Sequence, residues 1–449
     1  MLLNLPSCAT FAIRRFDQYN SAAMEPLPVD IFQLQRRDPA AWSALLARVP
    51  ETEDIIVTAV TSEPLYVTTP APPRRATADC AHRLRRYILT LDGCSDPISF
   101  IAKQTNTTEA LFYQLFGDPP GTAIPACHYA HLDGDSSWVV IDDVPDHYPS
   151  AGWMPDQVDA VIATLARAHA ARWNQDAADL NHGWGVAEPI IPHFLRRPGG
   201  AYTWHELRRS EATLFDEGPA AALSRHAVQN AGRLAPLLLR AANGLVVMRD
   251  LGGWPGVLGE SHLAAAAELL DDPVPMLAPL LDLPTTLLHG APHPGHWRST
   301  LFDEHYLVDW SESQIGPGVL DLVAFLEGFP LLHDEAADLH HLRLREMTPL
   351  LEETLVDTYL LTLSAELGPR SPSRAFRAAL PAARCLHVLL TWFPYFAAWA
   401  ADMPDRYTWQ RVNRLDESEL HHYHNAPAAG LRRYLAGVFD RFLRASHSL

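Results

Sequence analysis

Hydrophobic and polar positions follow two different patterns along the 449-residue chain. Up to about residue 144, short runs rich in β-branched residues are separated by turn sequences such as LDGCSDP, a pattern that predicts strands. The predicted strands cover 54–60, 64–69, 86–91, 98–104 and 138–144. One stretch among them, 107–116, is predicted to be a helix. This part of the chain therefore reads as a β-rich region with a single helix.

From residue 153 onward the apolar positions recur with helical spacing. In MPDQVDAVIATLARAHAARW, Val158, Val161, Ile162 and Leu165 form the i, i+3, i+4, i+7 stripe of an amphipathic helix. Further helices are predicted at about 220–242, 259–270, 335–367, 373–401 and 428–446. One β-like interruption, 285–310, predicts a strand or helix end, an irregular loop and a hairpin that turns at 302–305.

Together these patterns predict an α+β fold with two lobes and a ligand-binding cleft between them. The small β-rich N-lobe is predicted at 54–147, and the large, mainly helical C-lobe at 148–449, with a distinctive loop at 285–321. Residues 1–53 are predicted to be an N-terminal extension. Within it, 1–23 either are disordered or precede the true start of the protein at Met24.

Composition excludes several classes of partner. The formal net charge is −18 and there is no basic stripe, which argues against a nucleic-acid partner. The five cysteines are scattered and form no CxxC pair, as expected in a reducing cytoplasm. The most apolar late stretch, 386–401, is too short and too interrupted by proline to span a membrane. We therefore expect a cytoplasmic protein with neither a nucleic-acid nor a membrane partner.

Lys103 is the only lysine in the chain, whereas arginine occurs 34 times. It lies in the predicted strand 98–104, and Glu109 follows six residues later at the start of the predicted helix. A compact ammonium group on a strand can reach phosphate oxygens, and a nearby carboxylate can orient it. The alternative is that Lys103 is a solvated edge-strand residue that was kept by chance.

The residues around this lysine occur together with a second motif. The segment LLHGAPHPGHWRSTLFDEHYLVDWSESQIGPGVLDLVAFLEG resembles the catalytic segment of the aminoglycoside phosphotransferase and choline kinase-like superfamily, whose loop reads HGDxHxxN. KQTNTTEALFYQLF, WVVIDDV and LARAHAARW are similar to that family's lysine strand and helix, its hinge strand and its LAxxHAxxW helix. The resemblance covers about 54–330. It implies a protein-kinase-like fold that binds ATP and a divalent metal.

The resemblance also implies roles for individual residues at a nucleotide site. Lys103 would contact the α- and β-phosphates, and Glu109 would pair with Lys103. Backbone groups near Asp142, Asp143 and Val144 would receive the adenine. Each of these residues is present in this sequence at the position that the family pattern requires.

Four further positions concern the metal and the catalytic loop. The resemblance implies that Asp309 holds Mg²⁺, with Mn²⁺ as a possible substitute, and that Asp321 braces the loop. The second metal-ligand position is occupied by His296, although magnesium prefers oxygen donors and imidazole suits zinc, manganese or nickel better. The catalytic aspartate position is occupied by Ala291, which cannot accept a proton.

Losing a general base typically slows a reaction by ~10²–10⁴-fold. His289 or His293 could replace it, because histidine titrates near neutral pH. Both could instead make only structural hydrogen bonds, and a zinc site formed with His296 is a third alternative.

Two functions therefore stay open. The chain is either an ATP-dependent phosphotransferase acting on a small-molecule hydroxyl, or a catalytically impaired pseudokinase that binds a nucleotide or a protein partner. In a third alternative even the nucleotide site is vestigial.

Overall fold

The computed structural model describes residues 31–48, 55–65, 84–117, 123–174, 234–331, 347–400, 406–412, 414 and 431–449. These residues divide into two compact units, which are described separately. Unit 1 contains the described residues up to 149 together with 296–313. Unit 2 contains the described residues in 150–295 and from 314 onward. The segment 296–313, which was predicted to lie in the helical lobe, thus belongs to the strand-rich unit.

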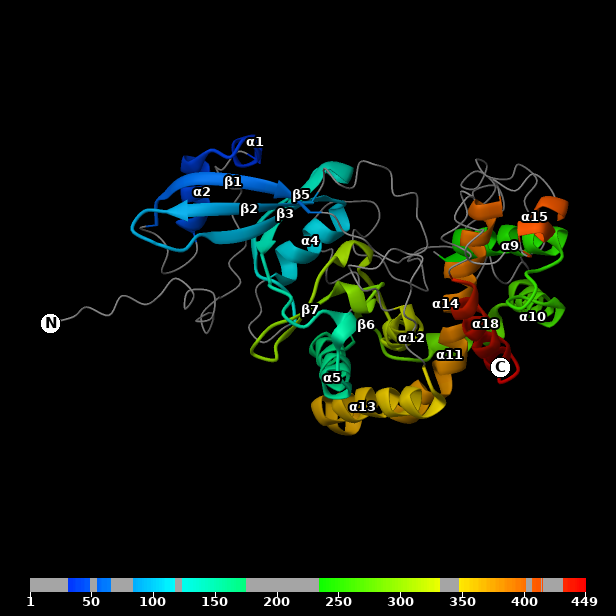
Figure 1. The fold of residues 1–449 in the computed structure, drawn as a ribbon. Helices are drawn as coiled ribbons and strands as arrows, with labels where there is room; N and C mark the ends of the chain where they lie inside the picture. The colour runs from blue at the N-terminus through cyan, green and yellow to red at the C-terminus, as the bar shows by residue number, and fades with distance from the viewer. Residues whose placement is uncertain are drawn as a thin grey trace. The chain divides into compact units, whose positions relative to one another are not determined.

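Unit 1 is built on a five-stranded antiparallel sheet with the strand order β1-β2-β3-β5-β4 (Figure 1). The strands are β1 Val57–Pro64, β2 Leu84–Leu91, β3 Ile98–Thr105, β4 Cys127–His131 and β5 Ser137–Asp142. Four of the five predicted strand regions are confirmed by β1, β2, β3 and β5. Of the predicted strand 64–69, Pro64 is the last residue of β1 and Leu65 lies outside it, whereas 66–69 lie outside the described residues. Strand β4 was not predicted.

Two short helices, α1 Ile31–Gln35 and α2 Pro39–Leu46, pack on the sheet. Leu34 and Trp42 are fully buried against sheet residues that include Tyr87 and Phe100. Asp38 caps α2, since its side chain accepts a hydrogen bond from the Ala40 backbone N–H. Residues 31–46, which fall within the predicted extension, are therefore part of the core of unit 1.

Helix α4, Thr107–Phe116, follows β3 directly and matches the predicted bounds. Asn106 caps it by accepting a hydrogen bond from the Glu109 backbone N–H at 2.9 Å. The predicted hairpin is also present, as β7 Trp297–Ser299 paired with β8 His305–Leu307. The Leu307 backbone N–H donates to Ala123 O at 2.6 Å, which ties the hairpin to unit 1.

Unit 2 is mainly helical. Its longer helices are α5 Pro155–Ala171, α9 Leu234–Leu251, α10 Glu260–Asp271, α11 Val274–Leu281, α12 Val319–Gly328, α13 Pro349–Leu367, α14 Ser373–Ala400, α15 Arg406–Val412 and α18 Arg432–Ser446. A short antiparallel pair, β6 Thr286–Leu288 with β9 Gln314–Gly316, lies at the two ends of the segment that carries the distinctive loop and hairpin. Helix α14 packs along α9, where Gly244 allows the backbone of Phe393 to approach closely.

The helices of unit 2 confirm the described parts of the predicted helices, with differences at some ends. Residues 220–233, 335–346 and 428–430 of those predictions lie outside the described residues. Helix α9 continues to Leu251, beyond the predicted end at 242. Helix α13 begins only at Pro349, because Thr348 caps it and proline is favoured in the first turn. Helix α11 was not predicted.

The small β-rich part and the larger helical part confirm the predicted α+β class. The predicted disorder or late start in 1–23 lies outside the described residues. No helix in the described ranges is both long and apolar enough to cross a bilayer.

Candidate functional site

Strand β3 and helix α4 bring Lys103 and Glu109 together. Phe100 and Ala102 face the core beneath α1 and α2, so the alternation of the strand turns Lys103 to the opposite face. Because α4 starts four residues later, Glu109 falls in its first turn, and its Oε2 lies 2.7 Å from Lys103 Nζ. The ion pair expected from the sequence is present.

Glu109 is almost completely buried, with 1% of its side chain exposed. Its Oε2 also accepts a hydrogen bond from the Thr105 hydroxyl. Its Oε1 accepts a hydrogen bond from the Trp310 backbone N–H at 3.1 Å. Burial raises the pKa of Glu109, and the charge of Lys103 only partly offsets this effect. The carboxylate thus connects β3, α4 and the segment around Trp310.

Asp309 is the third member of the cluster. Its Oδ1 accepts hydrogen bonds from Lys103 Nζ and, at 2.9 Å, from the Ser311 hydroxyl. Burial alone would raise its pKa, but the charges of Lys103 and His296 outweigh burial and hold the pKa of Asp309 far below its ordinary value. The same charge pairing keeps the pKa of Lys103 above its ordinary value although burial acts to lower it. The cluster therefore places the Lys103 ammonium between a carboxyl whose pKa burial raises and a carboxylate whose pKa neighbouring cations lower.

The backbone of Asp309 is in the left-handed region, with φ 68° and ψ 65°. This conformation is uncommon for a residue with a side chain and is often found at functional sites. The Asn106 side chain stabilises the segment by donating to Ser311 O at 2.9 Å, and the Trp310 ring stacks on Phe112 with centroids 4.0 Å apart. Unlike Glu109, Asp309 keeps 37% of its side chain exposed.

His296 approaches Asp309 from the hairpin. Its Nε2 lies 3.8 Å from Asp309 Oδ2. In the described part of the chain, no group of three or more His, Cys, Asp or Glu side chains is arranged to hold a metal ion. A divalent ion at this place would thus be held by the Asp309 carboxylate, with one imidazole beside it and other ligands from outside the chain.

The predicted adenine segment begins at the end of β5. The Asp142 side chain pairs with His128 Nε2 at 2.7 Å, and Asp143 pairs with Arg86 Nε at 2.5 Å and accepts a hydrogen bond from the Ser99 hydroxyl at 2.7 Å. Both carboxylates are therefore engaged within the sheet. The interaction predicted for Asp142, Asp143 and Val144 involves only their backbone groups and stays a prediction.

Of the predicted loop segment 285–321, residues 289–295, which resemble the catalytic loop, lie in unit 2. Asp321, in the first turn of α12, accepts hydrogen bonds from the His289 backbone N–H at 2.7 Å and the Gly290 backbone N–H at 3.0 Å. Its Oδ2 lies 3.3 Å from His169 Nε2, and His169 Nδ1 lies 2.6 Å from the Tyr359 hydroxyl. Gly290 has φ 86°, a conformation that favours glycine. A buried polar network thus holds the start of the loop.

In each of the two loop histidines, Nδ1 faces the backbone N–H of the residue two positions later. His289 Nδ1 accepts a hydrogen bond from the Ala291 N–H at 3.3 Å, and His293 Nδ1 accepts one from the Gly295 N–H at 3.0 Å. A neutral imidazole that accepts at Nδ1 carries its proton on Nε2. In this geometry neither ring presents a free basic nitrogen, and Ala291 contributes only a methyl group.

The structure therefore groups the predicted site residues in two sets. Lys103, Glu109, Asp309 and His296 lie together in unit 1, whereas the loop histidines, Ala291 and Asp321 lie in unit 2. Sequence reasoning missed the supporting residues Thr105, Asn106 and Ser311. The Asn-x-x-Glu spacing from Asn106 to Glu109, which is typical of helix N-termini, was the available signal.

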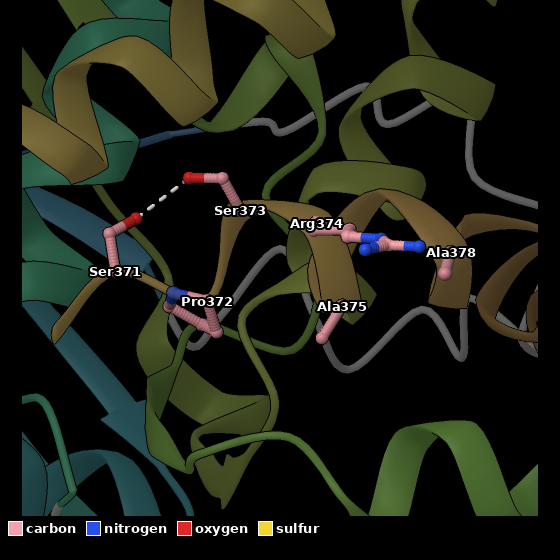
Figure 2. A pocket seen from close by; sticks show the side chains of 6 residues that line it. All are labelled: Ser371, Pro372, Ser373, Arg374, Ala375 and Ala378. Atoms are coloured by element: carbon pink, nitrogen blue, oxygen red, sulfur yellow. Dashed lines mark hydrogen bonds between the residues drawn. The ribbon is translucent and has the colours of Figure 1, made fainter. Parts of the chain in front are cut away.

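A surface pocket of about 520 Å³ occurs elsewhere in unit 2, at the start of α14 (Figure 2). The hydroxyls of Ser371 and Ser373 lie 2.8 Å apart there. The pocket is lined by Ser371, Pro372, Ser373, Arg374, Ala375 and Ala378. Because it contains none of the residues predicted from the sequence, the charged cluster of unit 1 is the candidate site.

No family model matches the sequence, and no curated protein matches it. The chain is similar to a solved aminoglycoside phosphotransferase from Alicyclobacillus acidocaldarius, with 15% identity, a TM-score of 0.42 and coverage of 81% of this chain and 89% of that chain. A choline kinase from Cryptosporidium parvum shows 9% identity, a TM-score of 0.42 and coverage of 91% and 96%. An amicoumacin kinase solved with AMP-PNP and Ca²⁺ shows 12% identity, a TM-score of 0.40 and coverage of 84% and 88%. Both kinase groups named in the sequence resemblance thus occur among the similar solved structures.

Proposed function

We propose that this protein binds a nucleoside triphosphate together with a divalent cation at the Lys103–Glu109–Asp309 cluster. One observation carries the proposal: the only lysine of the chain lies between a buried carboxylate and a partly exposed one. The buried Glu109 fixes the ammonium, while Asp309 has exposed surface available to a cation. Phosphate oxygens with their metal supply the charges that such an arrangement complements. ATP with Mg²⁺ is the pair that the sequence resemblance implies.

The candidate activity is transfer of the γ-phosphoryl group to a hydroxyl of a small molecule. Positioning and charge stabilisation provide most of the catalysis in phosphoryl transfer. The loss of the base at Ala291 would thus slow the reaction by ~10²–10⁴-fold rather than abolish it. The reducing cytoplasm predicted from the scattered cysteines would supply the nucleotide.

The alternative is a pseudokinase whose output is nucleotide binding or contact with a protein partner. The loop geometry favours this alternative, because Ala291 offers no acceptor and both loop histidines use Nδ1 to accept backbone hydrogen bonds. Both functions share the nucleotide site, so binding is the first quantity to measure.

Titration calorimetry with ATP, with and without a divalent cation, tests the shared proposal. We expect metal-dependent binding that is lost in Lys103→Met. Arg377→Met is the matched control, since it also removes one cation, from the exposed ion pair with Asp357 in unit 2. Absence of binding at millimolar ATP, or equal binding by both variants, would contradict the proposal.

Product formation then separates the two functions. Purified protein is incubated with ATP and a panel of small hydroxyl compounds, and Asp309→Ala supplies the background. A phosphotransferase exceeds that background, and Ala291→Asp raises its rate. A pseudokinase binds ATP yet remains at background.

A further inference from the structure

The two carboxylate oxygens of Asp309 face different partners. Oδ1 accepts hydrogen bonds from Lys103 and from the Ser311 hydroxyl at 2.9 Å. Oδ2 lies 3.8 Å from His296 Nε2. A cation that approaches this carboxylate at Oδ2 therefore meets an imidazole nitrogen next to the oxygen.

The hairpin holds these two side chains in place. Trp297 pairs with Leu307 in the β7–β8 register, and the Val308 N–H donates to His296 O at 2.9 Å. His296 thus lies across from the residue that precedes Asp309. Only 15% of the His296 side chain is exposed, which limits its freedom to turn into solvent. The juxtaposition is set by main-chain pairing and not by two mobile surface side chains.

The separation of the two donor atoms suits a shared metal ion. Metal bonds to imidazole and carboxylate are about 2.0–2.2 Å long, so two adjacent donors of one tetrahedral or octahedral ion lie roughly 3–3.5 Å apart. The 3.8 Å gap is slightly longer than this, so a small turn of either side chain would bring both donors onto one ion, and it is too long for a direct hydrogen bond.

The donor chemistry does not fit the magnesium that the resemblance implies. Mg²⁺ prefers oxygen ligands, whereas first-row transition ions accept imidazole readily. We infer that His296 and Asp309 together select a first-row transition ion such as Mn²⁺ over Mg²⁺. This inference rests on the proposed function, because it concerns the cation of the same site.

The test measures metal binding directly, without reference to turnover. Mn²⁺ and Mg²⁺ affinities of the full chain are measured in the presence of ADP by competition calorimetry, with free Mn²⁺ followed by electron paramagnetic resonance. We expect wild type to prefer Mn²⁺, and His296→Asn to lose ten-fold or more of its Mn²⁺ affinity, as expected when a nitrogen ligand is removed. Its Mg²⁺ affinity should stay equal or rise.

His128→Asn is the matched control. His128 also pairs with an aspartate in unit 1, but its 2.7 Å distance to Asp142 Oδ1 is that of a direct hydrogen bond and leaves no space for an ion between them. It should keep the Mn²⁺ preference of wild type. A measurement on unmutated protein covers the case in which His296→Asn does not fold: the electron spin-echo of bound Mn²⁺ should show modulation from a coordinated imidazole nitrogen.

The experiment distinguishes failure of the metal preference from failure of the proposed nucleotide binding. If ADP binds with both metals equally and the echo shows no nitrogen, the metal preference is overturned while the proposed function stands. If neither metal supports nucleotide binding, the proposed function fails, and the inference falls with it.

Discussion

Each unit of the molecule contains a cluster of paired charged side chains, and the two clusters have central groups of opposite charge. In unit 1 the cation Lys103 lies between the anions Glu109 and Asp309. In unit 2 the anion Glu327, on α12, lies between Arg384 of α14 and Arg441 of α18, at 2.7 and 2.6 Å.

The two clusters differ in how far their side chains are exposed to solvent. Glu352 of α13 accepts a hydrogen bond from Arg384 Nη2 at 2.7 Å, so the unit 2 cluster is neutral, and its two arginines are 12% and 13% exposed. In the unit 1 cluster, by contrast, Lys103 is 22% exposed and Asp309 is 37% exposed. A closed cluster joins helices, whereas one with an exposed carboxylate can accept a ligand. Buried charge alone does not distinguish a site from a structural contact.

The largest expected effect is in the closed cluster. Glu327→Gln should cost about 3–5 kcal/mol of unfolding free energy, because it leaves buried guanidinium groups without their shared counter-charge. Denaturant titration measures the loss. Asp357→Asn is the control, since its ion pair with Arg377 is about half exposed and should contribute less than ~1 kcal/mol. Equal losses in the two variants would remove the distinction between a closed cluster and a surface pair.

Replacing Lys103 by arginine in unit 1 and Arg384 by lysine in unit 2 should affect different quantities, ATP affinity in the first case and stability in the second. Lys103→Arg replaces a point charge by a planar fork that can engage both carboxylates and cover the Asp309 oxygens. ATP affinity should fall by about 30-fold or more, corresponding to roughly 2 kcal/mol, as measured by calorimetry.

The reciprocal variant Arg384→Lys should leave ATP affinity unchanged. It should lower stability by about 1–2 kcal/mol, because an ammonium cannot reproduce the fork that joins Glu327 to Glu352. Normal ATP binding by Lys103→Arg would show that the solitary lysine has no specific role.

The charged cluster in unit 1 was largely predictable from the sequence, for a physical reason. Lys103 stands out in a chain that otherwise uses arginine, and its strand and the following helix have strong local patterns. Glu109 then follows from helix geometry alone. The approach of Asp309, 206 residues away, depends on tertiary structure, and only the family resemblance supplied it.

Other features depend on packing that no local pattern records. Helices α1 and α2 are too short to have a clear period, and Trp42 becomes a core residue only when the sheet is present. The ring orientations of His289 and His293 are set by hydrogen bonds within their loop. Glu327 gives no sign in the sequence that two distant arginines will reach it.

Acidification should change the stability contributions of the two buried glutamates, Glu109 and Glu327, in opposite directions. Burial raises the pKa of Glu327, but Arg384 and Arg441 outweigh burial and hold the pKa below its ordinary value of 4.5. The pKa of Glu109 is raised above 4.5, first by burial. A depressed carboxyl pKa contributes stability that is lost as the pH falls below 4.5. A raised one adds stability as the pH falls toward 4.5, because the folded state takes up the proton first.

Unfolding free energies of wild type, Glu327→Gln and Glu109→Gln across pH 3–7 test this contrast. The wild-type advantage over Glu327→Gln should be constant above pH ~4.5 and shrink below it, by on the order of 1 kcal/mol. The wild-type stability relative to Glu109→Gln should instead rise as the pH is lowered toward ~4.5. If the two stability differences, wild type minus Glu327→Gln and wild type minus Glu109→Gln, changed with pH in the same direction, the opposite pKa shifts of the two glutamates would be contradicted.

The smallest expected effect concerns the backbone at Asp309. Its left-handed φ of 68° disfavours any residue with a Cβ, so Asp309→Gly should be more stable than Asp309→Ala by about 1 kcal/mol, although both lose the same carboxylate. Glu353, exposed on α13 in unit 2, is the matched position in an ordinary helix. There the order should reverse, with glycine less stable than alanine by about 1 kcal/mol.

Thermal unfolding of the four variants measures both differences. If alanine is the better residue at both positions, the strain at Asp309 is absent. If the order reverses as expected, the segment maintains a disfavoured conformation to hold this carboxylate beside Lys103, a cost of the kind that is found at functional sites. In the helices that Glu327 joins (α12, α14 and α18), no described residue other than glycine has a positive φ, so no comparable strain is present there.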